Sequence, residues 1–268
     1  MPGSQVPQDR DGLRGDAVYA LGSDPEERAR LQRQSDELRP YAVAILDRVG
    51  IGPGQAAVDV GCGPSGILDL LAERTSPGGR VVGLDIDPAN VATASELVRE
   101  RRLAGVEVIR ADAKRTGLPP GSFDLVHART LLINIPEPET AVAEMVRLAK
   151  PGGWVAGQEP DAGLSLCYPH LPAWDRINEI FQATYRRQGA DPLIGRRLTE
   201  LYWDAGLVDV GVEVRAGVFP AGHSRRTIRL ELIRSMRPKI IGFGLAGERE
   251  LDDWTGPPGS ISVTRGRC

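Results

Sequence analysis

The sequence contains few of the residues that build disulfide frameworks, metal centres and membrane spans. Its 268 residues include only three cysteines and three histidines. Cys62, Cys167 and Cys268 lie too far apart for a disulfide framework or a zinc knuckle. No apolar stretch approaches the length of a membrane span, and the polar N-terminus has no signal-peptide core. The sequence therefore predicts a cytoplasmic protein with no metal site and no membrane association.

An excess of positive charge is also missing. The formal net charge is −3, and no long run of Lys or Arg forms a local basic patch. Proteins that bind nucleic acid usually carry such a patch, because their affinity comes largely from phosphate contacts. We therefore expect no nucleic acid partner.

The chain does have a regular alternation of strand-like and helix-like segments between residues 56 and 160. The expected strands are "AAVDV", "RVVGLD", "VEVIRAD", "FDLVHA" and "GWVAGQEP". Three helices are expected between them: one that ends near Arg74, one over Pro88–Leu103 and one over about Glu137–Lys150. This alternation is typical of an α/β protein whose parallel sheet is covered by helices on both faces.

The segments on either side of this core follow other patterns. Residues 1–16 are predicted to be a flexible arm, and residues 17–49 are predicted to form two helices divided at Pro40. After Pro160 we expect helices over 171–188, 193–205 and 227–236, and strands at "VDVGVEV" (208–214) and "SISVTR" (260–265). We expect residues 17–49 and 161–250 to form the walls of a pocket.

A glycine turn follows the first expected strand. Gly61, Gly63 and Gly66 have the G-x-G-x-x-G spacing that lets a backbone approach a nucleotide-like ligand, and both nicotinamide enzymes and methyltransferases use such a turn. Asp59 lies just before the turn, where its carboxylate would repel a pyrophosphate. Asp85 ends the second strand and is placed to bind ribose hydroxyls in either class. Together the two acids favour a cationic ligand that contains ribose.

Four motifs in this order resemble the class I S-adenosylmethionine-dependent methyltransferases, in the branch of ubiquinone- and menaquinone-type and other bacterial small-molecule enzymes. They are "VDVGCGPSG", "VVGLDIDP", "VIRADAKRTGLPPGSFDLVHARTLL" and "EMVRLAKPGGWV". The resemblance implies a Rossmann-like, mostly parallel sheet of seven strands, with helices on both faces and S-adenosyl-L-methionine as the cofactor. It also implies an N-terminal helical lid over 17–49, and a methyltransferase domain over 50–268 with a helical acceptor-pocket insertion around 161–250.

The resemblance assigns roles to the cofactor-binding positions. Gly61 and Gly63 would face the amino-acid end of the donor, and Asp59 would lie near its ammonium group. Asp85 would bind the ribose, and Ile86, Asp112 and the backbone of Ala113 would contact the adenine. The residues expected near the sulfonium are His127, Ala128 and Arg129.

The N-terminal segment resembles a lid that closes over the donor. Tyr19, Arg28 and Gln34 are its candidate contacts. As open alternatives, Tyr19 could instead be a packing aromatic that anchors the arm, and Arg28 and Gln34 could be exposed helix positions.

The acceptor side offers fewer signals. His127 and Glu159 are the candidate bases, since a hydroxyl or phenol acceptor must lose a proton. A donor contact and a hydrogen-bonded strand end are the alternatives for His127. A salt bridge to Arg225, Arg226 or another nearby base is the alternative for Glu159. Tyr168, Trp174 and His223 are the candidate substrate-binding residues, with core or surface-loop positions as alternatives.

We therefore predict an enzyme that methylates a small molecule, plausibly in bacterial antibiotic or other secondary-metabolite biosynthesis. An NAD(P)-dependent oxidoreductase and a donor-binding protein without turnover remain open alternatives. The chain also lacks the Asn-Pro-Pro-Tyr and Asp-Pro-Pro-Tyr sequences that resemble base methylases. The N-terminal helix is a possible surface for homo-oligomer formation.

Overall fold

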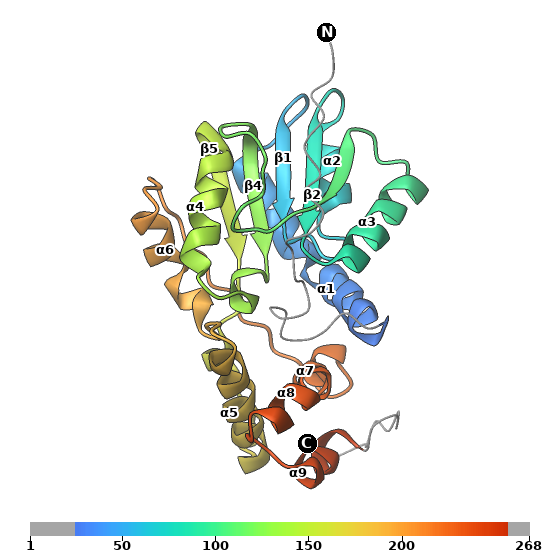
Figure 1. The fold of residues 1–268 in the computed structure, drawn as a ribbon, viewed down its shortest axis with the longest axis vertical. Coiled ribbons are helices and arrows are strands. Elements are labelled where there is room, and N and C mark those ends of the chain that lie inside the picture. Colours follow the sequence, from blue (N-terminus) through green and yellow to red (C-terminus); the bar gives the residue numbers. More distant parts are fainter. Residues whose placement is uncertain (1–24, 257–268) are drawn as a thin grey trace.

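A five-stranded parallel sheet forms the centre of the protein. The computed structural model describes residues 25–256, with side chains from residue 29 onward (Figure 1). The strands are β1 (Ala56–Val60), β2 (Arg80–Asp85), β3 (Val106–Arg110), β4 (Phe123–Arg129) and β5 (Ala149–Gln158). Their order is β3-β2-β1-β4-β5, and each neighbouring pair is parallel. The expected parallel sheet is thus confirmed, although the described residues supply five strands rather than seven.

The side chains of the central strands alternate between two buried faces. Ala57, Val81 and Leu125 pack against α1 (Pro25–Val49), α2 (Leu68–Thr75) and α3 (Pro88–Glu100). Their neighbours Val58 and Val82 point to the opposite core. Helices therefore cover both faces, as the near-continuous apolar strands indicated.

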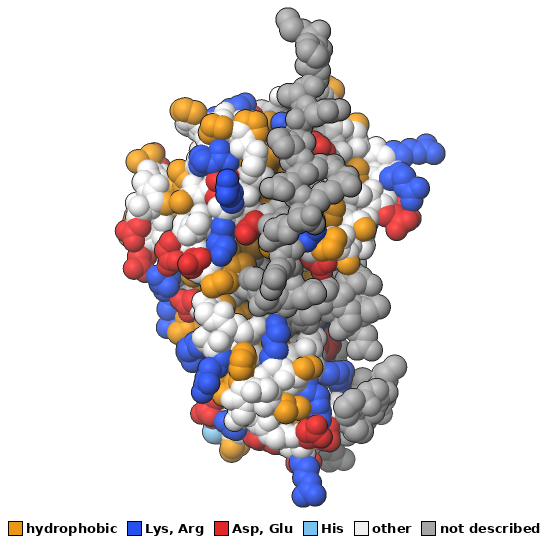
Figure 2. Space-filling model, viewed as in Figure 1, with side chains coloured by type: hydrophobic (Ala, Val, Ile, Leu, Met, Phe, Trp, Pro, Cys, Tyr) orange, Lys and Arg blue, Asp and Glu red, His pale blue; other side chains and the backbone are white. Residues whose placement is uncertain are grey.

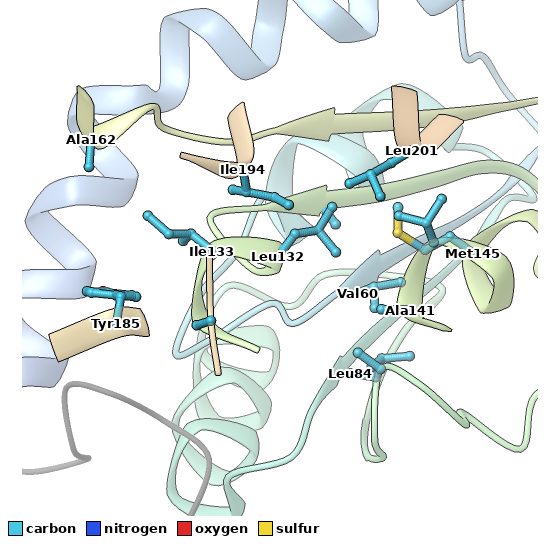
Figure 3. Packing of buried hydrophobic residues seen from close by; sticks show 14 of the residues in the cluster. Val60, Leu84, Leu132, Ile133, Ala141, Met145, Ala162, Tyr185, Ile194 and Leu201 are labelled. Atoms are coloured by element: carbon cyan, nitrogen blue, oxygen red, sulfur yellow. The ribbon is translucent and has the colours of Figure 1, made fainter. Parts of the chain in front are cut away.

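The second core extends beyond the sheet. On this face Val60 and Leu84 lie close to α4 (Pro138–Leu148), which contributes Ala141 and Met145 (Figure 3). The same cluster continues through Ile133 to Tyr185, which comes from α5 (Pro172–Arg187). One apolar core thus connects the sheet to the helices that follow it.

The remaining helices come after β5. They are α6 (Leu198–Asp204), α7 (Ile228–Ser235), α8 (Arg237–Gly242) and α9 (Glu248–Thr255), with the short 3-10 turns η3 (Ala162–Leu164), η4 (Ile194–Arg197) and η5 (Ser224–Arg226). A further 3-10 turn, η2 (Leu132–Asn134), lies between β4 and α4. Helices α5, α7, α8 and α9 gather at one end of the molecule, below the sheet in Figure 1.

Two sequence predictions of secondary structure are wrong. Residues 25–49 form one helix rather than two, with Pro40 inside it, because Ala42 and Leu46 are fully buried and hold the second half against the core. Residues 208–214 form no strand; Val208 and Val214 are 82% and 76% exposed, and no described strand pairs with this segment. The strand expected at 260–265 and the arm at 1–16 lie outside the described residues.

A buried polar network fixes the loop between β3 and β4. Glu144 on α4 accepts hydrogen bonds from the backbone N–H and the hydroxyl of Thr116, and from the guanidinium of Arg147. Arg147 also donates to the carbonyl of Leu118. The bonds from Arg147 and Thr116 lower the pKa of Glu144 to about 2, against the effect of burial. This network sets the position of the loop after β3.

We expect Glu144→Gln to lower the free energy of unfolding by about 2 kcal/mol at pH 7, because charge-assisted bonds to a buried group are lost. A depressed carboxyl pKa stabilises the fold above the unfolded value, near 4.5, and this contribution disappears as the pH falls through about 2. The difference between wild type and variant should therefore shrink between these pH values. Urea unfolding at several pH values measures it, and a difference independent of pH would contradict the assignment.

Candidate functional site

One large cavity lies at the carboxyl edge of the sheet. Its volume is about 1240 Å³, and it is lined by segments that follow each strand: 61–66, 85–87, 111–114, 129–131 and 160–162. Helices α1, α5 and α7 contribute the opposite walls. Ligands of open α/β sheets bind at this edge, and the volume exceeds that of a pocket for one drug-sized ligand.

The glycine turn adopts a backbone conformation that side chains rarely allow. Gly61, Gly63 and Gly66 have φ values of +68°, +60° and +53°. A Cβ on Gly66 would lie 2.1 Å from Oδ2 of Asp59, whereas a Cβ on Gly63 would meet no atom within 4 Å. Gly66 is therefore needed for packing, while Gly63 leaves open space at the cavity wall. This space fits the close approach of a ligand to the backbone.

Asp59 holds the turn from beneath. Its Oδ2 accepts a hydrogen bond from the backbone N–H of Ile67 at 3.0 Å, at the start of α2. Its Oδ1 lies 2.7 Å from Nδ1 of His127, and both side chains are buried. Asp59 also lines the cavity. Its carboxylate thus connects β1, β4 and the first turn of α2.

His127 is fully buried and is not among the residues that line the cavity. The second ring nitrogen faces Oε1 of Gln158 at 3.5 Å. This geometry does not support the predicted role of His127 as a base near the sulfonium. It matches the alternative of a hydrogen-bonded residue at a strand end, which positions Asp59.

Asp85 ends β2 at the cavity wall. Its Oδ2 accepts from the backbone N–H of Gly63 at 2.9 Å, and its Oδ1 accepts from the N–H of Asp87 and from the amide of Asn90. Burial raises the pKa of Asp85, and these three bonds oppose the rise. Each carboxylate oxygen can accept more than one bond, so Asp85 holds the glycine turn and keeps capacity for a further hydrogen bond at the cavity wall.

The loop after β3 carries the residues expected at the adenine. Asp112, Ala113 and Ile86 all line the cavity. Oδ1 of Asp112 accepts from the N–H of Lys114 at 2.8 Å, which fixes the orientation of the carboxylate. The cavity therefore brings together the predicted donor-binding residues that belong to β2 and β3.

Arg129 connects the glycine turn to α1. Its guanidinium donates to the hydroxyl of Ser35 at 2.8 Å and to the carbonyl of Gly66 at 3.4 Å, and the same hydroxyl donates to Gly66 at 3.1 Å. Nη1 of Arg129 is buried without a hydrogen-bond partner, and burial lowers the pKa of the group. Arg129 lines the cavity, as predicted for a residue near the donor.

Glu159 supports the loop after β4 and does not line the cavity. Its carboxylate accepts from the backbone N–H groups of Leu131, Leu132 and Ile133, at 2.8, 2.8 and 3.2 Å. Burial raises its pKa to about 7, against these three bonds. This position outside the lining does not support contact with an acceptor, and within residues 25–256 Glu159 forms no salt bridge to Arg225, Arg226 or another basic residue.

The three predicted substrate-binding residues lie in different surroundings. Trp174 lines the cavity and its indole N–H donates to the carbonyl of Ser165. Tyr168 lies at the rim and is 96% exposed. The position of His223 does not support its predicted role: it is not among the residues that line the cavity, and its Nδ1 accepts from the N–H of Arg225.

The predicted lid residues are only partly described. Gln34 on α1 lines the cavity and accepts a hydrogen bond from Arg30. Tyr19 lies outside the described residues, and the side chain of Arg28 does too, although its backbone belongs to α1. Gln34 thus faces the cavity rather than solvent.

Sequence reasoning missed the far wall of the cavity. This wall includes Phe181 and Tyr185 of α5, Arg229 of α7 and Lys239 of α8. Arg229 shares the buried stripe of Ile233, Met236 and Ile240. A charged residue at i with apolar residues at i+4, i+7 and i+11 is a signal that could have identified it.

Substitution of His127 distinguishes a role in positioning Asp59 from a role as a catalytic base. We expect His127→Leu to lower the midpoint of thermal unfolding and to weaken binding of S-adenosylhomocysteine several-fold, because the buried Asp59 carboxylate loses a partner. His127→Gln should restore part of both, and the exposed His170→Leu should change neither. Scanning and titration calorimetry measure the effects. Loss of turnover with unchanged stability and affinity would instead assign a base.

The described residues were also compared with the requirements of a metal site and of a membrane span. Within residues 25–256, no cluster of three or more His, Cys, Asp or Glu side chains could hold a metal ion. In the same part of the chain, no helix has both the length and the apolar character of a membrane span.

Comparisons with known proteins agree with this geometry. Residues 58–157 match a family model described as a methyltransferase domain. The demethylmenaquinone methyltransferase of Geobacillus sp. (strain WCH70) is 30% identical over 63% of this chain and 77% of its own length. The nocamycin O-methyltransferase of Saccharothrix syringae is 42% identical over 43% of this chain and 41% of its own length. The chain spans 41–77% of the length of the first three curated relatives.

A solved structure shows the same fold. The SAM-dependent methyltransferase of Aquifex aeolicus superposes with a TM-score of 0.56 at 22% identity, over 73% of this chain and 94% of that one. The match of residues 58–157 covers the glycine turn, Asp85, Asp112 and Arg129. The family match, the Geobacillus relative and the cavity at the carboxyl edge lead to one conclusion: the chain belongs to the class I S-adenosylmethionine-dependent methyltransferases.

Proposed function

We propose that the protein transfers a methyl group from S-adenosylmethionine to a small, largely apolar molecule. The observation that carries this proposal is the single cavity that joins the donor-side residues to the walls from α5 and α7. Its volume of about 1240 Å³ leaves room for both a donor and an acceptor. On the face in Figure 2, basic and acidic side chains of the described residues are interspersed, which also favours a small acceptor over nucleic acid.

The residues present fit the donor. The open space at Gly63 receives its amino-acid end, with Asp59 and Arg129 nearby. Asp85 accepts from the ribose hydroxyls, and Asp112 accepts from the adenine amino group beside Ile86. When bound, S-adenosylmethionine supplies an activated methyl carbon, which forms a bond to the acceptor atom as the carbon–sulfur bond breaks and sulfur keeps the electron pair.

The protein contributes mainly alignment and exclusion of water. Ile133, Ile177 and Phe181 line the acceptor side with apolar surface. Such walls bring the two reactants together and strengthen the electrostatic interactions around them. His127 and Glu159 do not line the cavity, so neither residue accepts a proton released by a hydroxyl acceptor.

Helix α1 is the proposed lid. Leu31, Gln34 and Ser35 of this helix line the cavity beside the glycine turn. The bonds of Arg129 and Ser35 to Gly66 hold the helix over the donor side. We place the acceptor pocket between this lid and the helical segment that follows β5.

The relatives suggest the kind of acceptor. One acts on demethylmenaquinone and another is an O-methyltransferase for nocamycin. These names support an apolar acceptor with an oxygen or carbon nucleophile. A role in bacterial secondary-metabolite biosynthesis is part of the same proposal.

The test is methyl transfer itself. The full-length protein is incubated with tritium-labelled S-adenosylmethionine and a panel of apolar quinols, phenols and enolic acids, and labelled products are extracted. We expect label in at least one acceptor, and none with the Asp85→Ala variant. Tight binding of S-adenosylhomocysteine without transfer to any acceptor would instead favour a donor-binding protein without turnover.

A further inference from the structure

A buried cation lies in the acceptor half of the cavity. Arg229 is 8% exposed and lines the cavity wall formed by α7. Its guanidinium carbon lies 3.7 Å from the centre of the Phe181 ring, which covers one face of the group. The flat guanidinium thus packs on an aromatic ring inside the pocket.

Arg229 has no carboxylate partner among the described residues. Other arginines of these helices are paired: Arg225 with Glu37 at 3.5 Å, and Arg176 with Glu250 at 2.9 Å. Burial lowers the pKa of Arg229 to about 10, so the group still carries its charge at neutral pH. A buried charge without a partner is costly, and proteins keep one mainly where it meets a ligand.

The charged residues that line the cavity differ between its two halves. Asp59, Asp85 and Asp112 lie on the donor side, where Lys114 and Arg129 also line the cavity. At the other end, Lys239 joins Arg229 in the lining, and its amino group donates to Gln188 at 2.9 Å. The two cations from α7 and α8 favour an anionic group in the acceptor half of the cavity.

The surroundings of Arg229 narrow the class of anion. Because Phe181 covers one face of the guanidinium, the N–H groups around its edge remain for hydrogen bonds. Those groups form a planar fork that matches two oxygens of a delocalised anion. The neighbouring lining is apolar, with Ile177, Ile228 and Leu232. An apolar body with one planar acidic group fits this arrangement.

We propose that Arg229 binds an anionic group of the methyl acceptor, which is therefore an apolar acid that carries a carboxylate or a similarly delocalised oxyanion. This inference rests on the proposed function and specifies its substrate class. Arg229 then determines specificity, because it fixes which end of the acceptor faces away from the donor.

Two matched fluorescent probes test the proposal without knowledge of the natural acceptor. 8-Anilinonaphthalene-1-sulfonate carries one delocalised anion, and N-phenyl-1-naphthylamine has the same ring skeleton without it. Both are titrated into full-length protein in the presence of S-adenosylhomocysteine. We expect Arg229→Gln to weaken binding of the sulfonate at least tenfold, the typical loss for a charge-assisted bond, and to change binding of the neutral probe less than twofold.

Further variants control for folding and for general charge. Arg229→Met keeps the length and fills the space, so it should fold and show the same loss. Arg229→Lys should retain part of the affinity. Arg234→Gln changes an exposed arginine on the same helix, whose bond to the carbonyl of Thr255 lies away from the cavity lining, and should leave both probes unaffected.

The outcomes separate the inference from the proposed function. Equal losses for both probes, no loss for either, or no binding of the sulfonate to wild type would overturn the role of Arg229. S-Adenosylhomocysteine affinity is measured in parallel by calorimetry. If wild type fails to bind it, the proposed function fails; if it binds while Arg229→Gln has no selective effect, only the inference about the acceptor fails.

Discussion

Asp85→Ala is expected to weaken binding of S-adenosylhomocysteine about 100-fold or more. The carboxylate is placed to accept from two ribose hydroxyls, and each charge-assisted bond contributes roughly 1.5–3 kcal/mol. The substitution also leaves the N–H groups of Gly63 and Asp87 without their acceptor, so the glycine turn loses its attachment to β2. Titration calorimetry on full-length protein measures the change.

Two other variants make this result specific. Asp85→Asn keeps oxygen acceptors without the charge and should give an intermediate loss. Asp204→Ala removes an exposed carboxylate at the end of α6 and should leave the affinity unchanged. If Asp85→Ala bound S-adenosylhomocysteine as tightly as wild type, the ribose assignment would be wrong.

Gly66→Ala is expected to have the largest effect on the fold around the donor site. The new Cβ would lie 2.1 Å from Oδ2 of Asp59 and 3.0 Å from the Cβ of Cys62, at a φ of +53°. Overpacking and left-handed backbone strain together cost roughly 2–4 kcal/mol. We expect a fall of roughly 5–15 °C in the unfolding midpoint, measured by scanning calorimetry, and loss of detectable binding of S-adenosylhomocysteine.

Two glycine variants separate clash, strain and ligand approach. Gly117 has a φ of +73°, and a Cβ added there would meet no atom within 4 Å. Gly117→Ala should therefore lower the free energy of unfolding only by the backbone strain, roughly 1 kcal/mol. Gly63→Ala also has open space, but at the cavity wall. It should therefore fold with the same small cost and bind S-adenosylhomocysteine at least tenfold more weakly. Equal stability of Gly66→Ala and Gly117→Ala would contradict the packing role of Gly66.

The central sheet could be predicted from the sequence because local pattern and burial agree there. The strands that include Val58, Val82 and Val126 are mostly apolar in their central positions, and turns or helix starts follow them directly. The donor-side residues follow strand ends, and parallel strands bring those ends to one edge. Asp59, Asp85 and Asp112 therefore come together without any long-range information.

Other parts depend on packing that a sequence pattern does not contain. Pro40 usually marks a helix boundary, yet burial of Ala42 and Leu46 continues the helix through it. The alternation at 208–214 predicts a strand, but a strand needs a partner, and none is present among the described residues. Arg229 lines the cavity and His223 does not, although both lie in the same region of the chain.

The two candidate bases show the same limit at the site. The positions of His127 and Glu159 at or after strand ends predict residues of the carboxyl edge, but neither side chain lines the cavity. The direction of each side chain depends on which neighbour takes its hydrogen bonds. His127 is hydrogen-bonded to Asp59. Glu159 accepts hydrogen bonds from three backbone N–H groups at the η2 loop, so neither side chain faces the cavity.

The most direct test of the account is calorimetric titration of the wild-type protein with S-adenosylmethionine, S-adenosylhomocysteine and NAD. The cavity at the glycine turn has acids at the donor end, which suit a cationic donor and repel a pyrophosphate. We predict micromolar binding of both sulfur ligands, with one site per chain, and no measurable binding of NAD. Binding of NAD, with neither sulfur ligand bound, would contradict the methyl-donor assignment of this site.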